Sequence, residues 1–252
     1  MSDNIVLKTN QEIALMKEAG AIVCAILDSV EYIVEEGIST MDLEMKARAL
    51  CKEYKVTPAF LGYCGFPAVL CTSVNEEVVH GIPSKKKILR HGDIVSIDMG
   101  VILGGYFGDS ARTCIVGEVS KEIHHLLEYT RKALEVGISH MVDGDTLFTL
   151  SAAIYKVAEE AGLGVVRKYS GHGIGTKLHE PPAVFNYVPT GYSDIVLRKG
   201  MVLAIEPMFT AGSYETRVLR DKWTVVTKDR SYSAHFEHTV AITDDGPKVL
   251  TI

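Results

Sequence analysis

The segment RHGDIVSIDMG, residues 90–100, ends an apolar run with a carboxylate, Asp98. Its isoleucines and valine are typical of a buried strand, where an acid is unfavourable unless it has a partner. The segment RKGMVLAIEPM, residues 198–208, repeats the design, with Glu206 in the place of the aspartate. This recurrence predicts two related strands that each end in an acid, one in each half of the chain.

Each of these acids has a second acid on a neighbouring strand. The Gly-Gly pair at 104–105 is a hairpin signal, and this turn puts Asp109 two residues from the position opposite Asp98. Such diagonal neighbours lie about 7–8 Å apart at the backbone and share one face. Glu237, in the strand-like SAHFEHTVAIT, is the corresponding companion of Glu206. We therefore expect two strand pairs that carry two carboxylates each.

Four buried carboxylates need a positive partner, because otherwise they take up protons. A single acid at a strand end is more often a solvated edge or a turn cap, but two matching pairs favour a shared role. No cluster of Arg and Lys accompanies all four, so divalent metal is the simplest partner. Two divalent ions would balance four negative charges, and oxygen ligands suit Mn, Fe(II), Co or Mg.

The segment YSGHGIGTKLHEPP, residues 169–182, surrounds His172 with glycines that allow close backbone approach. The glycines indicate a loop, and a position in such a loop between the two acid pairs favours His172 as a metal ligand, whereas a lone His is usually a satisfied core or surface residue. His179 need not share that role, and the spacing excludes the helical HExxH motif. His80 is equally compatible with an active-site donor and a strand end. No role is assigned to the histidines that flank Glu237. The residues alone thus predict a two-metal hydrolase.

The two halves of the chain, about 1–118 and 119–252, have the same order of elements. Each begins with two segments of helical spacing and continues into strands. Thr9 with Glu12, and Ser39 with Asp42, form capping-box patterns at the starts of the first two helices. This order predicts two pseudo-symmetric α/β halves that share one core as a single domain, 1–252. The expected helices cover 9–37, 39–55, 120–141 and 145–162, and the expected strands cover 94–103, 106–116, 201–209 and 234–243.

Composition narrows the class of protein further. The 252 residues are 47% hydrophobic, with a net charge of −6, which does not favour general nucleic-acid binding. Five cysteines without a CxxC pair argue against a disulfide framework or a thiolate zinc site, so a reducing cytoplasm is expected. The N-terminus lacks a signal-peptide pattern, and no apolar run is long enough for a membrane span.

Five motifs in order resemble the metal-binding motifs of type I methionine aminopeptidases, and the resemblance covers essentially the whole chain. The resemblance implies an α+β pita-bread fold, shared with prolidase, aminopeptidase P and creatinase, around a curved antiparallel sheet. No N-terminal extension or helical insertion is expected, so the short bacterial-type form is the nearest match. The motifs are SIDMG (96–100), GDSART (108–113), GHGIGTKLHE (171–180), AIEPM (204–208) and FEHT (236–239).

The resemblance also implies the roles of individual residues. Two divalent ions, of Co, Mn, Fe(II), Zn or Ni, would be held with Asp109 and Glu237 as bridging ligands. Glu206 would also act as general base, His179 would contact the scissile carbonyl, and His80 would bond to the peptide nitrogen beyond it. The implied ligands are Asp98, Asp109, His172, Glu206 and Glu237. The implied methionine pocket and substrate contacts are Tyr63, Phe66, Cys71, His80, His179 and Trp223.

Four positions depart from the pattern typical of bacterial members, so the resemblance does not determine the shape of the pocket. Phe66 stands where Tyr is frequent, Phe60 where a small Cys is common, Leu178 where an aromatic residue is common, and Gly100 where a hydroxyl residue is common.

The expected activity is removal of the initiator methionine from nascent polypeptides, with a small second residue preferred. Two alternatives remain at this point: a Xaa-Pro peptidase on the same fold, and a non-catalytic binding module. The protein is expected to be a cytoplasmic monomer without membrane or specific DNA partners. The basic cluster PSKKKILRH, residues 83–91, is either an ordinary solvated loop or a ribosome contact.

Overall fold

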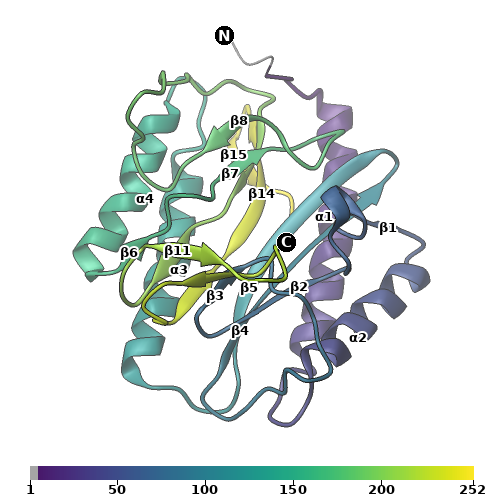
Figure 1. Ribbon diagram of the computed structural model, residues 1–252. Helices are drawn as coiled ribbons and strands as arrows, with labels where there is room; N and C mark the ends of the chain where they lie inside the picture. Colours follow the sequence, from purple (N-terminus) through teal and green to yellow (C-terminus); the bar gives the residue numbers. More distant parts are fainter. Residues whose placement is uncertain (1–4) are drawn as a thin grey trace.

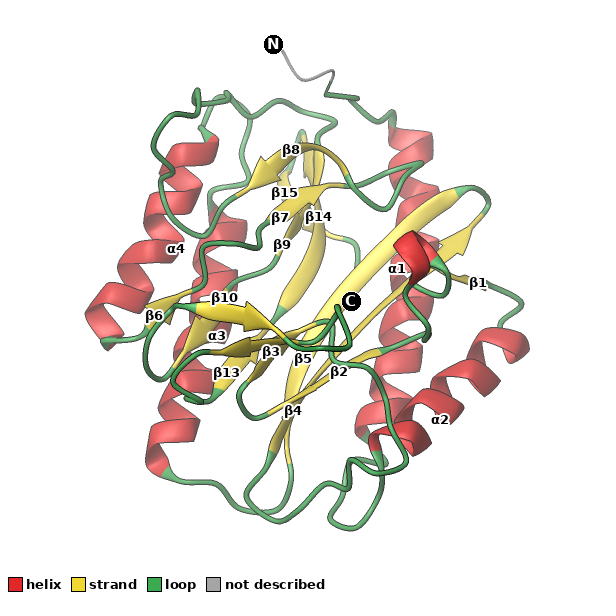
Figure 2. Ribbon diagram, in the orientation of Figure 1, coloured by secondary structure: helices red, strands yellow, loops and turns green. Residues whose placement is uncertain are grey.

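The computed structural model describes residues 5–252 as an α+β protein in which two pairs of helices flank a curved antiparallel sheet (Figures 1 and 2). The helices are α1 (Asn10–Glu31), α2 (Thr40–Glu53), α3 (Lys121–Ser139) and α4 (Leu147–Ala161), with a short 3-10 turn, η1 (Tyr63–Gly65). The strands are β1 (Thr57–Pro58), β2 (Cys71–Val74), β3 (Glu77–Val79), β4 (Ile94–Leu103), β5 (Tyr106–Ile115), β6 (Gly164–Val165), β7 (Gly171–Gly173), β8 (Glu180–Val184), β9 (Val202–Ile205), β10 (Met208–Thr210), β11 (Thr216–Val218), β12 (Val225–Thr227), β13 (Ser233–His235), β14 (Glu237–Thr243) and β15 (Gly246–Val249). Within this part of the chain, no helix has both the length and the apolarity of a transmembrane segment.

The capping boxes predicted for the first two helices are confirmed. Thr9 and Glu12 exchange hydrogen bonds at the start of α1, and Ser39 does the same with Asp42 at the start of α2. The predicted end of the first helix at Gly37 is wrong, because α1 ends at Glu31. The following residues turn, and Gly37, with φ at 95°, donates its N–H to the carbonyl of Leu89, so this segment bonds to a distant loop instead of to the helix.

The hairpin of β4 and β5 has the predicted register. Asp98 pairs with Ala111, and Asp109 pairs with Gly100, so the two aspartates are diagonal neighbours on one face. The large sheet runs in the order β1-β4-β5-β14-β9-β7-β8. Strand β5, from the first half of the chain, is thus bonded directly to β14 from the second half, and this junction brings the two acid pairs together.

The strands expected at 201–209 and 234–243 are each broken into two. The first divides at Glu206-Pro207, and the second divides at Phe236. His238 pairs with Ile205 in the large sheet, whereas Met208 pairs with His235 in a separate sheet of three strands. The chain passes from one sheet to the other at Glu206-Pro207 and at Phe236. Glu206 and Glu237 therefore lie where regular strand pairing is interrupted, and such interruptions are common beside functional sites.

The helices pack on the outside of the sheet, α1 against β4 and β5, and α3 against β9, β10, β13 and β14. The approach of α1 is close enough to require glycine. A Cβ at Gly20 would lie 2.3 Å from the carbonyl oxygen of Leu250, and a Cβ at Gly108 would lie 2.8 Å from the backbone nitrogen of Gly20. This contact fixes α1 directly behind the strand that carries Asp109.

One buried carboxylate stabilises the segment that leads into β2. Glu44 of α2 is 1% exposed, and it accepts the backbone N–H groups of Val69 and Leu70 and the Nε–H of Arg48. Charge-assisted bonds of this kind are about twice as strong as neutral ones. Glu44 therefore holds the chain between two pocket residues, Phe66 and Cys71.

Replacing Glu44 by Gln is expected to lower the free energy of unfolding by about 1–3 kcal/mol, because the amide has one oxygen for these donors and adds a buried N–H₂ group without a partner. Urea unfolding followed by circular dichroism measures the change. Glu35→Gln, at an exposed position, is the matched control. Equal midpoints for the two variants would contradict the assigned role of Glu44.

Candidate metal centre and substrate pocket

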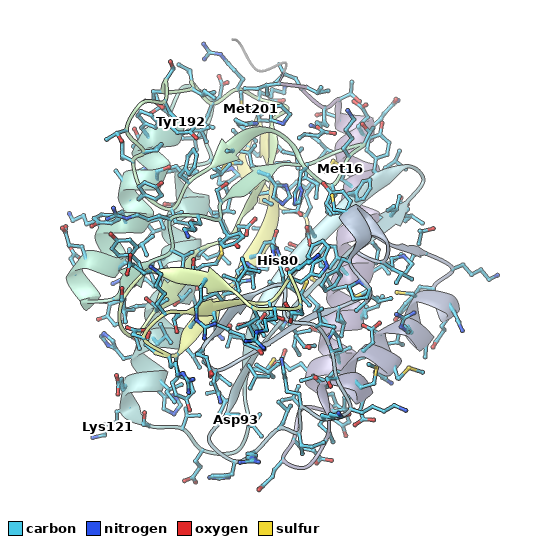
Figure 3. All side chains as sticks on the ribbon, in the orientation of Figure 1. Met16, His80, Asp93, Lys121, Tyr192 and Met201 are labelled. Atoms are coloured by element: carbon cyan, nitrogen blue, oxygen red, sulfur yellow. The ribbon has the colours of Figure 1, made fainter. Side chains whose placement is uncertain are left out.

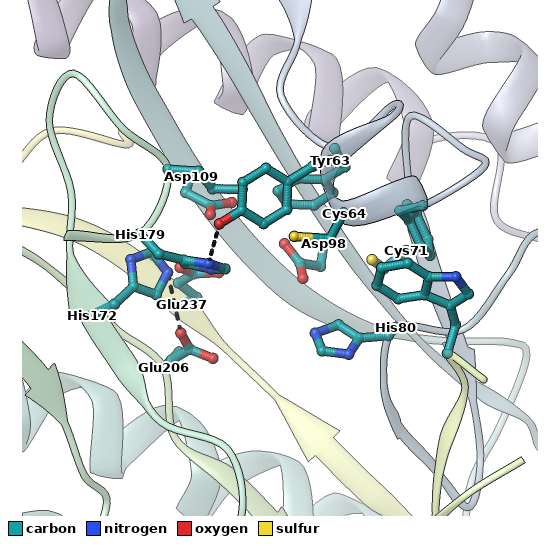
Figure 4. Close-up of a pocket in the computed structure, with 14 residues that line it drawn as sticks. Tyr63, Cys64, Cys71, His80, Asp98, Asp109, His172, His179, Glu206 and Glu237 are labelled. Carbon is teal, nitrogen blue, oxygen red and sulfur yellow. Dashed lines mark hydrogen bonds and ion pairs between the residues drawn. The ribbon is translucent and has the colours of Figure 1, made fainter.

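The sheet brings all four predicted acids into one cavity (Figure 4). Asp98 and Asp109 come from β4 and β5, Glu237 begins β14, and Glu206 directly follows β9. Glu237 pairs with Ala111 of β5, and the neighbouring His238 pairs with the last residue of β9. Strand β14 thus lies between β5 and β9. Its first residue, Glu237, adds a carboxylate beside Asp109 of β5 and beside Glu206, which follows β9.

His172 lies among these acids, in the short strand β7 rather than in a loop as the glycines had indicated. Its Nδ1 is 2.9 Å from the carbonyl oxygen of Gly173. Since a carbonyl only accepts, Nδ1 carries the ring proton and Nε2 keeps a free lone pair. Nε2 lies 3.6 Å from Oε1 of Glu206, so the free nitrogen points toward the carboxylates.

Burial strongly disfavours the charged forms of these groups. It raises the pKa of Asp98 to about 7, with His235 opposing the shift and Glu206 adding to it. Burial, and then the neighbouring carboxylates, hold the pKa values of Asp109 and Glu237 well above their usual range, and burial does the same for Glu206. Without a cation, the cluster cannot carry its four negative charges at neutral pH.

Unpartnered oxygens show that a divalent cation fits this cluster. Oδ1 of Asp98, Oδ1 of Asp109 and Oε1 of Glu237 have no hydrogen-bond donor among residues 5–252. One ligand atom from each of Asp109, His172 and Glu237 lies within 4.8 Å of the other two. Hard carboxylate oxygens with one imidazole form a donor set for divalent transition metals. A cation would replace the water that these oxygens lose on burial.

His235 is a member of this centre that the sequence did not indicate. Its Nε2 lies 3.6 Å from Oε2 of Glu206, and neither ring nitrogen has a hydrogen-bond partner in the described part of the chain. Its backbone is held by the hydroxyl of Thr113, which exchanges bonds with the His235 N–H and carbonyl. The only signal available was its spacing two residues before Glu237, which becomes informative only when the break at Phe236 is known.

The cavity, of about 280 Å³, continues from the acids into an apolar chamber. Trp223 and Phe66 close it with an edge-to-face contact, with ring centroids 5.1 Å apart. The structure places every residue of the predicted methionine pocket in the lining of this one cavity. The lining comprises Phe60, Tyr63, Cys64, Phe66, Cys71, His80, Leu178, His179 and Trp223, together with Asp98, Asp109, His172, Glu206 and Glu237.

His179 lies between the chamber and the acids. Burial lowers its pKa, so the ring is neutral near pH 7. Its Nδ1 is 2.8 Å from the hydroxyl of Tyr63, and its ring centroid is 4.2 Å from that of His172. A tyrosine hydroxyl that donates to Nδ1 leaves the ring proton on Nε2, where it is available to a substrate oxygen.

His80 lines the same cavity from the end of β3. Its backbone has φ at 59°, an uncommon conformation for a residue other than glycine, and its ring contacts Tyr169 and Trp223 edge to face. Burial lowers the pKa of His80 to about 4, so it is neutral. A strained, half-buried position of this kind is typical of a residue with a functional role, although strain alone assigns none.

Two of the departures from the bacterial pattern are coupled through space. A Cβ at Gly100 would lie 3.1 Å from Cε1 of Phe60 and 3.0 Å from the Cβ of Ala59. The ring of Phe60 therefore occupies the space in which a side chain at position 100 would begin. The large residue at position 60 and the missing side chain at position 100 form one packing unit in the wall of the chamber.

A buried carboxylate–imidazole cluster on this α+β fold defines the class of metal-dependent hydrolases, and comparisons with known proteins agree. The sequence profile of metallopeptidase family M24 matches residues 14–244. A methionine aminopeptidase of Clostridium acetobutylicum is 47% identical and covers 98% of this chain and 99% of its own length. The crystal structure of methionine aminopeptidase from Thermotoga maritima has a TM-score of 0.95 at 44% identity and covers 98% of this chain and 99% of that one. A prolidase from Pyrococcus horikoshii matches with a TM-score of 0.80 at 25% identity, over 98% of this chain but 63% of its own.

The chain belongs to metallopeptidase family M24. The sheet, with its two flanking helix pairs, is the pita-bread fold of that family, as predicted. The resemblance to type I methionine aminopeptidases is likewise confirmed by bacterial relatives that carry this name.

Proposed function

We propose that this protein is a metal-dependent methionyl aminopeptidase, which removes the initiator methionine from polypeptides with a small second residue. The observation that carries the proposal is the apolar chamber of aromatic and cysteine side chains opening directly onto the acid cluster. An unbranched thioether packs well against aromatic faces and adapts to an irregular chamber. Family membership and the names of close relatives agree with this activity.

We propose that two divalent ions would be held by Asp98, Asp109, His172, Glu206 and Glu237. Of Co, Mn, Fe(II), Zn and Ni, the cluster accommodates each, since oxygen and imidazole ligands select weakly among them. The cations would polarise the scissile carbonyl and acidify the attacking water. Their charge would also keep the crowded carboxylates ionised at neutral pH.

The protein's own groups supply the remaining steps. A carboxylate oxygen of Glu206 accepts a proton from the attacking water and passes it to the leaving nitrogen as the peptide C–N bond breaks. Nε2–H of His179, oriented through Tyr63, donates to the carbonyl oxygen as negative charge develops on it. The ring of His80 forms a hydrogen bond with the peptide nitrogen beyond the scissile bond. The methionine side chain fills the chamber beside Trp223, which leaves the free amino group facing the carboxylates and restricts cleavage to the first residue.

Several further assignments belong to this proposal. The site takes residues from both halves of the chain, which supports one catalytic domain over 1–252 with halves near 1–118 and 119–252. Five free cysteines support a reducing compartment such as the cytoplasm. We assign a monomer that acts on nascent chains.

In the basic cluster 83–91, Lys87 is already paired with Glu77 at 2.5 Å, which leaves fewer free charges for a ribosome contact.

The two alternative functions are less well supported. A non-catalytic relative has no need to keep a complete ligand set. Here five candidate metal ligands line one cavity, together with the polar side chains of Tyr63, His80 and His179. A Xaa-Pro peptidase would have the same fold and would differ from the proposed enzyme in the substrate that it selects. The prolidase of similar fold is a longer chain, of which this one covers 63%.

A direct test measures methionine release from Met-Ala-Ser by the purified protein, after chelation and again after addition of Co or Mn. We expect no release without metal, release in its presence, and no cleavage of Ala-Pro. Metal content is measured in parallel by elemental analysis. Bound metal without methionine release would reject the function while sparing the fold, and faster cleavage of Ala-Pro would favour the Xaa-Pro peptidase.

A further inference from the structure

A second cavity also reaches the acid cluster. It encloses about 400 Å³ and shares His80, Asp98, His172, His179 and Glu206 with the first cavity. The residues that line the second cavity but not the first are Val79, Lys168, Tyr169, Ser170, Gly171, Glu180, Ala183 and His235. The metal centre is thus open in two directions, and only one of them carries the aromatic and cysteine wall.

The proposed function gives these two openings different roles. If the first residue of the substrate fills the apolar chamber, the polypeptide after the scissile bond has to leave through the other opening. His80 is one of the residues that line both cavities, so it lies where the two meet. The second cavity would therefore contain the second and third residues of a substrate.

Lys168 is the one cationic side chain among the residues that line these two cavities. It is exposed, and its amino group makes no hydrogen bond or ion pair with any residue of the described chain, 5–252. The same lining contains three acids, and none of them forms an ion pair with Lys168. Asp98 and Glu206 belong to the acid cluster, and Glu180 is paired with Lys8 at 2.6 Å. The amino group of Lys168 is free to meet a negative group of the substrate.

Positive charge continues beyond Lys168. A smaller hollow of about 120 Å³ is lined by Lys168 together with Arg167, Lys228 and Glu215. Lys228 is paired with Glu215 at 3.3 Å, so these two charges offset each other. The guanidinium of Arg167 lies 4.3 Å from the ring centroid of Tyr214, which holds it in place without cancelling its charge. Two cations without an ion-pair partner in the described chain therefore lie side by side, Lys168 in the lining of both hollows and Arg167 in that of the smaller one.

We propose that Lys168, supported by Arg167, forms a carboxylate-binding subsite for the third residue of the substrate. This subsite rests on the proposed function. With it, the protein favours polypeptides that begin Met-Ala-Asp or Met-Ala-Glu over those with a neutral or basic third residue. The same subsite would bind the terminal carboxylate of a tripeptide. Because the cations are exposed, the preference is modest and sensitive to salt.

The test compares kcat/KM for three C-terminally amidated peptides, Met-Ala-Asp-Gly, Met-Ala-Asn-Gly and Met-Ala-Lys-Gly, with the metal-loaded enzyme. We expect Asp to exceed Asn by about three- to fivefold, mainly through KM, as exposed ion pairs allow. Lys168→Glu is expected to reverse the order, so that Lys exceeds Asp. Raising the salt concentration to 0.5 M should reduce both preferences. Met-Ala-Ser with a free carboxylate, compared with its amide, separates the terminal carboxylate from the side chain as ligand.

Lys121→Glu provides the matched control, since Lys121 is an exposed lysine at the start of α3, well away from His80 (Figure 3). It should leave the Asp-to-Asn ratio at the wild-type value. Cleavage of all three peptides at one rate, unchanged in Lys168→Glu, would overturn the subsite while leaving the proposed function intact. No cleavage of the Asn peptide by a metal-loaded protein would instead overturn the proposed function.

Discussion

Replacing Glu206 by Gln is expected to lower kcat for a Met-Ala peptide by about 10²–10⁴-fold. The amide cannot accept the proton of the attacking water, and it offers one oxygen in place of two. Glu206 is also the acid nearest to two imidazoles, since its oxygens lie 3.6 Å from Nε2 of His172 and 3.6 Å from Nε2 of His235. The change therefore weakens metal affinity as well, and kcat is compared at saturating metal.

The fold should survive this substitution. Burial raises the pKa of Glu206, so a neutral amide removes one source of repulsion from the metal-free cluster. Thermal unfolding of the metal-free variant is expected at or above the wild-type midpoint. Glu159→Gln, an exposed change on α4, serves as control and should retain full activity. A Glu206→Gln enzyme with wild-type kcat would show that another group takes the proton.

Replacing Lys8 by Met is expected to lower the free energy of unfolding by about 3–5 kcal/mol, because it leaves a buried charge unpaired. Nζ of Lys8 lies 2.6 Å from Oε2 of Glu180, and the two side chains are only 4% and 7% exposed. Lys8 also donates its backbone N–H to Gly200, in the turn that precedes β9. Glu180 directly follows His179, so we expect kcat to fall together with stability.

The double variant Lys8→Met/Glu180→Gln tests whether the pair itself carries this effect. Removing both charges should recover much of the lost stability, since a neutral pair has no uncompensated charge. Burial alone would raise the pKa of Glu180, but the hydrogen bond and charge of Lys8 outweigh burial and lower it below 4.5. The contribution of Glu180 is therefore present above pH 4.5 and is lost as the pH falls through its folded-state pKa.

The difference between wild type and Lys8→Met should accordingly shrink as the pH falls from 7. The unpaired carboxyl of the variant, whose pKa burial raises, takes up a proton first, and the paired carboxyl of the wild type does so only below pH 4.5. Urea unfolding at pH 7 and at pH 4 measures both effects. Lys199→Met, which removes an exposed ion pair with Asp244, is the control and should cost less than about 1 kcal/mol. Equal losses in the two lysine variants would contradict the structural role assigned to Lys8.

Local patterns in the sequence were sufficient for the elements that carry the acids. The Gly-Gly turn at 104–105 sets the register of its own hairpin, so the diagonal relation of Asp98 and Asp109 followed without coordinates. Capping boxes likewise marked the starts of α1 and α2, because the bonds involved join residues three apart. The end of α1 was not predictable in this way, since it depends on a bond from Gly37 to the distant Leu89.

By itself, the sequence determined which acids and histidines to consider and the two strand pairs that present them, because turns and alternation act over a few residues. Only the tertiary structure decided that β5 and β14 join, that the ribbon breaks at Glu206-Pro207 and Phe236, and that His235 and the Lys8–Glu180 pair stand at the site. These features depend on contacts between residues that are well separated in the sequence, by 172 positions for Lys8 and Glu180 and by 29 for Glu206 and His235. Such contacts form where packing and hydrogen bonding of the whole chain are satisfied together, and no local pattern encodes them.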